Sequence, residues 1–277
     1  MIRTGIVLGV VIFLAIVGAT AQEILSPRLK GLRLYGSSEA DLPILKQRSG
    51  TVTLEFDITD SAPPNLQLIF VHCDRNWMPT QTPFVNDEVR LKTRGELPFV
   101  PAPHGVHGYG YQYRILIPEY PSPGTFTFSG NYIVEIMDQD INQLLGRARF
   151  FVVESLVKPE MRVTNRRDPG ASSPWNQVNQ ISVSFRIPPQ DSSAGPAFFS
   201  TDFGIVDIYR NREVTRRWRI DSDDRDANTF VDGLGTSRLR FRIDNVFPGN
   251  EYRVFDIRNV DQYPQDRPAR LRGGADV

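Results

Sequence analysis

Apolar and polar residues alternate in short runs along most of this chain. Such alternation is typical of β-strands that face a core on one side and water on the other. Residues 51–58 show it most clearly, with the apolar residues on one face: Val52, Leu54, Phe56 and Ile58. After the first 21 residues, no segment keeps the spacing of an amphipathic helix over three turns. The pattern therefore predicts an all-β protein.

Gly- and Pro-containing segments separate the predicted strands. In the first half the strands are residues 29–36, 51–58, 66–74, 110–118, 130–138 and 144–154. In the second half they are residues 160–165, 180–188, 203–211, 214–221, 238–245 and 251–259. Residues 130–154 read as a hairpin that turns at 138–143. Because the pattern breaks after residue 154, we expect two β-sandwich domains in tandem, at residues 22–156 and 157–260.

The two ends of the chain do not follow the strand pattern. Residues 1–21 combine Arg3, an apolar run, and small residues at Ala19 and Ala21, which predicts a secretory signal peptide. A retained membrane anchor is the alternative, although the apolar run is shorter than the ~20 residues that span a bilayer. Residues 261–277 are polar and lack periodicity, so we expect a disordered tail.

Charge and cysteine content narrow the classes of function. The chain has 32 basic and 32 acidic residues, so no bulk charge favours nucleic acid or an anionic membrane. Its one cysteine cannot close a disulfide within the chain, so the folded state must be stabilised by burial alone.

Residues 72–77, His-Cys-Asp-Arg-Asn-Trp, follow an apolar run and concentrate reactive residue types. If the strand continues through them, His72 and Asp74 share one face while Cys73 and Trp77 share the other. Because the run is apolar on both faces, we interpret it as the end of a central strand. Cys73 and Trp77 would then belong to the core, and Cys73 would be unreactive.

A metal-dependent hydrolase built on His72, His104 and His107 is a minor hypothesis. Zinc needs three or four ligands, and the last two histidines lie in a Pro/Gly-rich loop. Residues 138–142 and 221–226 lack the Gly and Glu positions of an EF-hand. No nucleophile elbow, phosphate-binding loop or HExxH is present. We therefore expect no enzymatic activity, no metal and no cofactor.

Aromatic residues suggest one candidate binding surface. Tyr109, Tyr111 and Tyr113 alternate with small or polar residues, so they fall on one face of a strand. They could form a platform for sugar or peptide, although cross-strand packing is the ordinary role of such residues. Residues 79–108 form a long irregular stretch, which we rank as the first domain's main contact surface.

Several motifs in order resemble the type IX secretion system plug protein family, once described as a Bacteroidetes domain of unknown function. The resemblance extends from about residue 26 to 260 and rests on five segments in order, at residues 70–80, 111–138, 147–154, 176–185 and 248–259. They contain three short motifs: His72, Cys73, Asp74 and Trp77; Ser129, Gly130, Asn131 and Tyr132; and Asn250, Glu251, Tyr252 and Arg253.

The resemblance implies an immunoglobulin-like first domain followed by a further β domain. It also implies a non-enzymatic subunit in the periplasm, at the inner face of the outer membrane. That subunit would plug the translocon barrel through protein–protein contacts, without a small-molecule substrate. An exported carbohydrate- or peptide-binding module is the alternative function. Family members usually continue well past the third motif, whereas this chain ends 24 residues after Arg253. We therefore expect a C-terminally truncated member with an incomplete second domain.

Overall fold

The structure, a computed structural model, consists of β-strands and their connections. It describes residues 21–47, 49–82, 91–93, 95–119, 125–168, 170, 177–188, 198–210, 213–224, 226–248, 271–272 and 275–276. Within these residues the only helical element is a single 3₁₀ turn, η1 (Ser200–Phe203), so the all-β prediction is confirmed. None of the described residues forms a helix long and apolar enough to cross a membrane.

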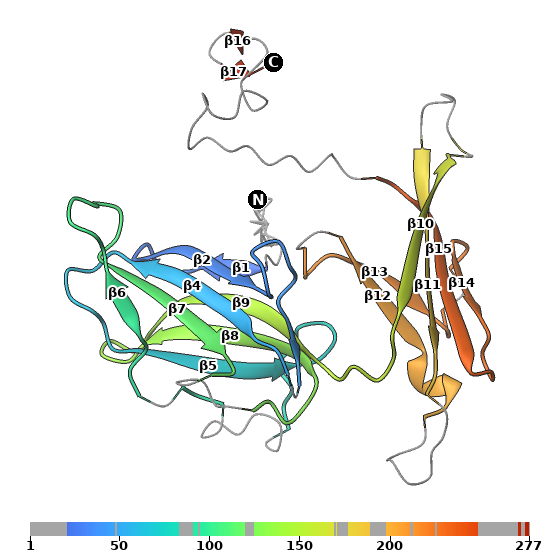
Figure 1. The fold of residues 1–277 in the computed structure, drawn as a ribbon, viewed down its shortest axis with the longest axis horizontal. Helices are drawn as coiled ribbons and strands as arrows, with labels where there is room; N and C mark the ends of the chain where they lie inside the picture. The colour runs from blue at the N-terminus through green and yellow to red at the C-terminus, as the bar shows by residue number, and fades with distance from the viewer. Residues whose placement is uncertain are drawn as a thin grey trace, which may run out of the picture.

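Two facing sheets form an N-terminal unit (Figure 1). Sheet 1 has the order β1-β9-β8-β5, with β3 parallel to β9, and contains β1 (Gln22–Ile24), β3 (Ile44–Lys46), β5 (Leu66–Cys73), β8 (Gly130–Asp138) and β9 (Gln143–Val153). Sheet 2 has the order β2-β4-β7-β6 and contains β2 (Leu29–Tyr35), β4 (Val52–Ile58), β6 (Phe99–Pro101) and β7 (Tyr111–Ile117).

A smaller C-terminal unit follows the connection at residues 154–159. Sheet 3 has the order β10-β11-β15-β14 and contains β10 (Glu160–Arg167), β11 (Gln177–Arg186), β14 (Thr229–Asp232) and β15 (Arg238–Val246). Sheet 4 is the hairpin of β12 (Ile205–Tyr209) and β13 (Arg217–Asp221). Among the described strands, β16 (Leu271–Arg272) and β17 (Ala275–Asp276) pair only with each other.

Most predicted strands are present near the expected bounds, and the hairpin at 130–154 is confirmed. Six short strands were not predicted: β1, β3, β6, β14, β16 and β17, the last two within the tail that was expected to be disordered. The predicted strand 251–259 lies outside the described residues, as do residues 1–20 of the predicted signal peptide and most of the predicted tail. The proposed boundary at 156/157 falls between β9 and β10, and as a domain boundary it stays a prediction.

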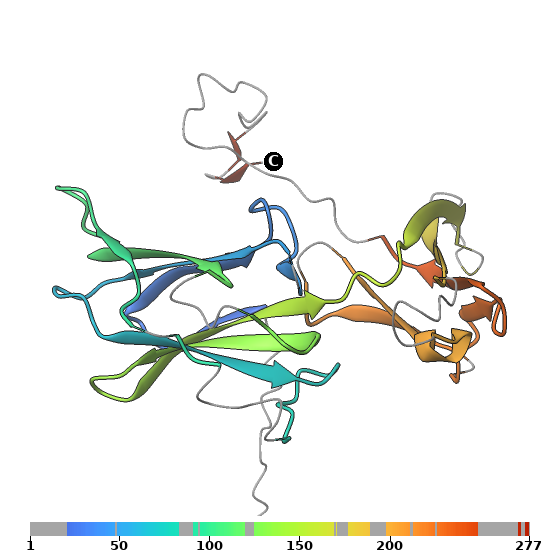
Figure 2. The same ribbon diagram turned by 60° about the horizontal axis from the view of Figure 1, so that its bottom comes forward.

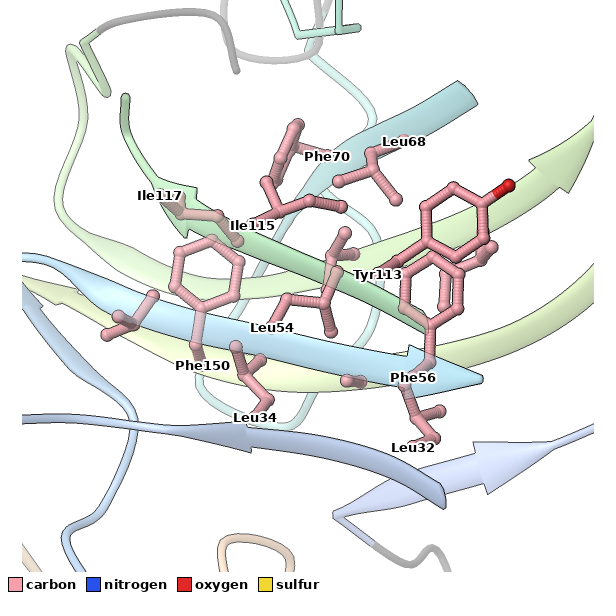
Figure 3. Packing of buried hydrophobic residues seen from close by; sticks show 14 of the residues in the cluster. Leu32, Leu34, Leu54, Phe56, Leu68, Phe70, Tyr113, Ile115, Ile117 and Phe150 are labelled. Atoms are coloured by element: carbon pink, nitrogen blue, oxygen red, sulfur yellow. The ribbon is translucent and has the colours of Figure 1, made fainter. Parts of the chain in front are cut away.

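An aromatic cluster fills the space between sheets 1 and 2 (Figure 3). The Phe150 ring lies 5.5 Å from both Phe126 and Tyr132, and 6.2 Å from Phe70. These edge-on and stacked arrangements add to the free energy gained by burying the rings. The cluster extends into leucine, isoleucine and valine residues of both sheets, which makes it the core of the N-terminal unit.

Charged residues fasten one end of this sandwich. The guanidinium of Arg28 forms ion pairs with Asp60, which follows β4, and with Asp138, at the end of β8, the latter at 2.8 Å. The hydrogen bond to Asp60, opposed in part by desolvation, raises the pKa of Arg28 above its ordinary value. Asp60 follows a strand of sheet 2 and Asp138 ends a strand of sheet 1. The Arg28 side chain therefore links the two sheets at one end of the sandwich.

β5 is the edge strand of sheet 1, so the prediction that it is a central strand is wrong. Its outer edge is nevertheless covered. Backbone bonds join Phe70 N to Leu91 O at 2.8 Å and Thr80 N to His72 O at 2.9 Å. The strand looks central in sequence because Ile69 and Val71 are apolar on its outer face, and the structure leaves both of them half-buried.

We predict that Phe150→Ala lowers the free energy of unfolding by about 3–5 kcal/mol, because the substitution leaves a cavity among three other rings. Urea unfolding followed by circular dichroism measures the loss. Phe128→Ala is the matched control, since its side chain is 42% exposed. Equal losses in the two variants would contradict a core centred on Phe150.

Candidate functional site

The segment 72–77 contains the end of β5 and a tight turn. Asp74 N donates to Met78 O at 2.8 Å, and Trp77 N donates to Asp74 O at 3.0 Å. The Asp74 carboxylate accepts from the backbone N–H groups of Asn76 and Met78 at 2.8 and 2.9 Å. Aspartate favours such turns because its side chain satisfies nearby N–H groups. The strand therefore ends at Cys73.

This turn corrects the prediction for Trp77. The residue has a φ of +65°, in the left-handed region that non-glycine residues seldom adopt. Strand alternation does not continue past Cys73, so Trp77 does not enter the core between sheets 1 and 2. Its indole instead lies over the outer face of sheet 1, 5.3 Å from the Phe151 ring.

His72 is held on the inner face of β5. Its Nδ1 lies 2.8 Å from Thr80 Oγ1 and its Nε2 lies 3.1 Å from the Ser129 carbonyl oxygen. Because a carbonyl oxygen only accepts, Nε2 carries the proton. The ring also meets Tyr132 edge-on at 5.0 Å. These contacts make His72 part of the packing that joins β5 to β8.

The two motifs at residues 72–77 and 129–132 lie side by side. Gly130 has a φ of +146°, and a Cβ atom there would lie 2.5 Å from His72 Nε2. Asn131 Nδ2 donates to Asp74 O at 3.0 Å, and Tyr132 OH donates to Phe128 O at 3.0 Å. The second motif therefore positions both the histidine and the turn.

Cys73 lies on the opposite face from His72 and is 1% exposed. Burial, reinforced by the negative charge of Asp74, raises the pKa of its thiol to about 11. Adjacent strand residues point to opposite faces, so the structure does not pair this thiol with the neighbouring imidazole. Cys73 is buried, as predicted, but it lies on the outer face of sheet 1 and not in the core between sheets 1 and 2.

The turn packs on a platform of side chains on the outer face of sheet 1. Register places Cys73, Asn131 and Phe151 in one row across β5, β8 and β9. Arg149, only 8% exposed, lies with its Cζ 5.9 Å from the centre of the Trp77 ring. An arginine over an aromatic face gains electrostatic as well as packing energy.

The C-terminal unit contacts this platform through the β12–β13 hairpin. Trp77 Nε1 donates to Val214 O at 3.3 Å, and Arg217 donates to Asn76 Oδ1 at 2.8 Å. Figures 1 and 2 both show the hairpin reaching the N-terminal unit. The turn is therefore a joint between the two units.

A ring contact continues the joint beyond the turn. Tyr209, the last residue of β12, lies 5.2 Å from the Phe151 ring, and its burial raises the pKa of its hydroxyl. Sequence reasoning missed the residues that meet the motif here. The chain carries no local signal that residue 77 meets residue 214, because the pairing depends on how the two units pack. The missed residues are Arg149, Phe151, Tyr209, Val214 and Arg217.

The three tyrosines singled out by their alternation separate in the structure. Tyr113 is 1% exposed and stacks on Phe56 at 4.8 Å, so it lies in the core and not on the surface. Tyr109 and Tyr111 line a shallow depression of about 610 Å³, together with His104 and His107. A partner-binding role for Tyr109 and Tyr111 stays a prediction.

Two groups of predicted site residues need separate mention. Asn250, Glu251, Tyr252 and Arg253 lie outside the described residues. Among the residues that the structure describes, no group of three or more His, Cys, Asp or Glu side chains is arranged to hold a metal ion. His72 is engaged between β5 and β8, whereas His104 and His107 lie in the loop before β7.

Comparison with known proteins identifies a matching family model and a solved structure of similar fold. Residues 29–154 match the family described as "Type 9 secretion system plug protein 1st domain". The crystal structure of a hypothetical protein from Parabacteroides merdae is similar, with a TM-score of 0.62 and 17% sequence identity. The similarity covers 87% of this chain and 58% of that one, and at this identity it shows the fold alone. No curated protein matches the chain.

We predict that Asp74→Ala destabilises the protein by about 1–3 kcal/mol, because two backbone N–H groups of the turn lose their acceptor. Urea unfolding measures the change. Asp74→Asn is the matched control, since its amide oxygen can still accept both bonds. If Asp74→Asn lost as much stability as Asp74→Ala, the carboxylate charge would be responsible and the turn argument would be wrong.

We predict that Cys73 reacts slowly with thiol reagents in the native state. A pKa raised to about 11 keeps the thiol protonated at neutral pH, and the thiolate is the reactive form. Iodoacetamide labelling followed by mass spectrometry measures the rate. Denaturant should accelerate the reaction strongly, and rapid labelling of the folded protein near pH 7 would contradict the prediction.

Proposed function

We propose that this protein is a plug or accessory subunit of the type 9 secretion system, because residues 29–154 match the family described as "Type 9 secretion system plug protein 1st domain". It would act in the periplasm, without enzymatic activity, by occluding the outer-membrane translocon barrel. The family match is the observation that carries the proposal.

The joint between the two units supports a steric role. A plug must resist deformation when it sits in an opening. The Trp77–Val214 and Asn76–Arg217 hydrogen bonds link the units, and the Phe151–Tyr209 ring contact continues that link. Polar bonds alongside packed rings fix orientation as well as distance. The protein can therefore present both units as one body to a partner.

The reactive residue types of the chain also fit a role without chemistry. His72 joins β5 to β8, and Cys73 is buried with a raised pKa. Asp74 accepts two backbone hydrogen bonds within its own turn. Each of these side chains stabilises the fold, which leaves occlusion and binding as the modes of action that we propose.

An exported carbohydrate- or peptide-binding module is the second candidate function. The observation in its favour is the depression that contains Tyr109 and Tyr111. Tyr111 is itself anchored, since its hydroxyl donates to Ser61 O at 3.2 Å and its ring meets Phe99 edge-on at 5.2 Å. A fixed aromatic ring beside an open depression is a common platform for a sugar ring.

We predict that the tagged protein, expressed in a bacterium that has a type IX system, co-purifies with the translocon barrel after the outer membrane is solubilised. The plug proposal requires this contact. Mass spectrometry of the purified complex identifies the partner. A well-folded, normally exported protein that brings down no translocon component would overturn the proposal.

Tyr111→Ala separates the two functions. If the protein is a plug, the variant should keep its association with the barrel, and neither protein should bind a glycan array. Glycan binding by the native protein that disappears in the folded variant would instead support the binding module.

A further inference from the structure

β10 is an exposed edge strand of eight residues. All eight of its residues are exposed, and within the described part of the chain it pairs only with β11. The other long edge strands are protected. β5 is covered by residues 79–80 and 91–93, and β2 is interrupted by a shift in register between Lys30 and Arg33. Proteins usually protect long edges in these ways, because an open edge invites pairing with another chain.

The apolar inner face of sheet 3 continues onto this edge. Met161 lies opposite Val183 and Val163 lies opposite Ile181, and both residues of β11 are buried. Met161 is 62% exposed and Val163 is 53% exposed. The face that forms the core of the C-terminal unit is therefore uncovered at β10. A further strand beside β10 would cover it.

We propose that β10 pairs antiparallel with β10 of a second copy of this chain, with Val163 on the two-fold axis. This register places Glu160 of each copy opposite Arg166 of the other, so two ion pairs flank the axis. Met161 falls opposite Asn165, and the two Val163 side chains meet. The contact joins two four-stranded sheets into one continuous sheet.

Neighbouring registers are less favourable. An axis at Arg162 would bring the two Arg162 side chains together. An axis at Thr164 would place Arg162 opposite Arg166 twice. Like charges directly opposite each other destabilise a strand pair, whereas opposite charges stabilise it. An axis at Met161 or Asn165 would pair fewer residues of β10. The charge pattern of the strand thus selects the register centred on Val163.

Such a contact is isologous, since the same surface serves both copies, and it closes as a dimer. It goes beyond the proposed secretion role and does not depend on it, because only the C-terminal units of two copies take part. A translocon could be absent and the dimer would still form.

Sedimentation of the full chain over a range of concentrations tests the proposal. We expect the weight-average mass to rise towards twice that of the chain. Glu160→Arg and Arg166→Glu should each weaken the dimer at least tenfold, because each change places like charges opposite each other. The double variant restores both pairs and should recover most of the association.

Cysteine crosslinking tests the register. Cα atoms of directly opposed antiparallel residues lie about 4.5–5.5 Å apart, within the range of a disulfide. Val163→Cys should therefore form a crosslinked dimer under mild oxidation. Asn165→Cys is the matched control, since two such residues would lie about 13 Å apart along the ladder. Cys73 is buried and adds little background.

Three results would overturn the proposal. One is a wild-type chain that stays monomeric at every concentration. Another is a dimer that Glu160→Arg leaves intact. The last is crosslinking of Asn165→Cys as efficient as that of Val163→Cys. Because all four substituted positions are exposed, the variants should fold, and circular dichroism tests whether they do.

Discussion

The rings of Tyr132 and Phe150 stand on neighbouring strands of sheet 1 and pack against Phe70 and Phe126, with no disulfide to fasten the sandwich. His72 continues the same row, since register places it opposite Tyr132. The position of the whole His-Cys-Asp segment thus depends on aromatic packing in the core. The turn that follows can project Trp77 outward because the strand before it is fixed.

The period-2 pattern was sufficient to predict the long strands, because each buries one face and leaves the other wet. It failed for strands of three or four residues such as β1 and β6, which carry too few residues to show a period. It also failed at β5, whose outer edge is hydrogen-bonded to segments 79–80 and 91–93 rather than to another strand of the sheet.

The candidate site was predictable only in part. The sequence and the family resemblance singled out His72, Cys73 and Trp77. The structure places Trp77 at the joint between the units and Cys73 on the same outer face of sheet 1, whereas His72 lies on the inner face. Strand alternation gave the wrong face for Trp77, because hydrogen bonds to the Asp74 side chain form a turn that ends the strand. The hydrophobic period of the sequence does not reveal these bonds. Val214 and Arg217 could not be predicted, since their contacts depend on packing between segments far apart in the sequence.

The β12–β13 hairpin packs against both units. Ile208 and Ile220 belong to the core of the C-terminal unit, whereas Tyr209 and Val214 contact the N-terminal unit. Unfolding of either unit would remove contacts that the hairpin makes, so the stability of each unit depends in part on the other. A change in one unit can therefore alter the stability of surfaces in the other that lie far from the joint.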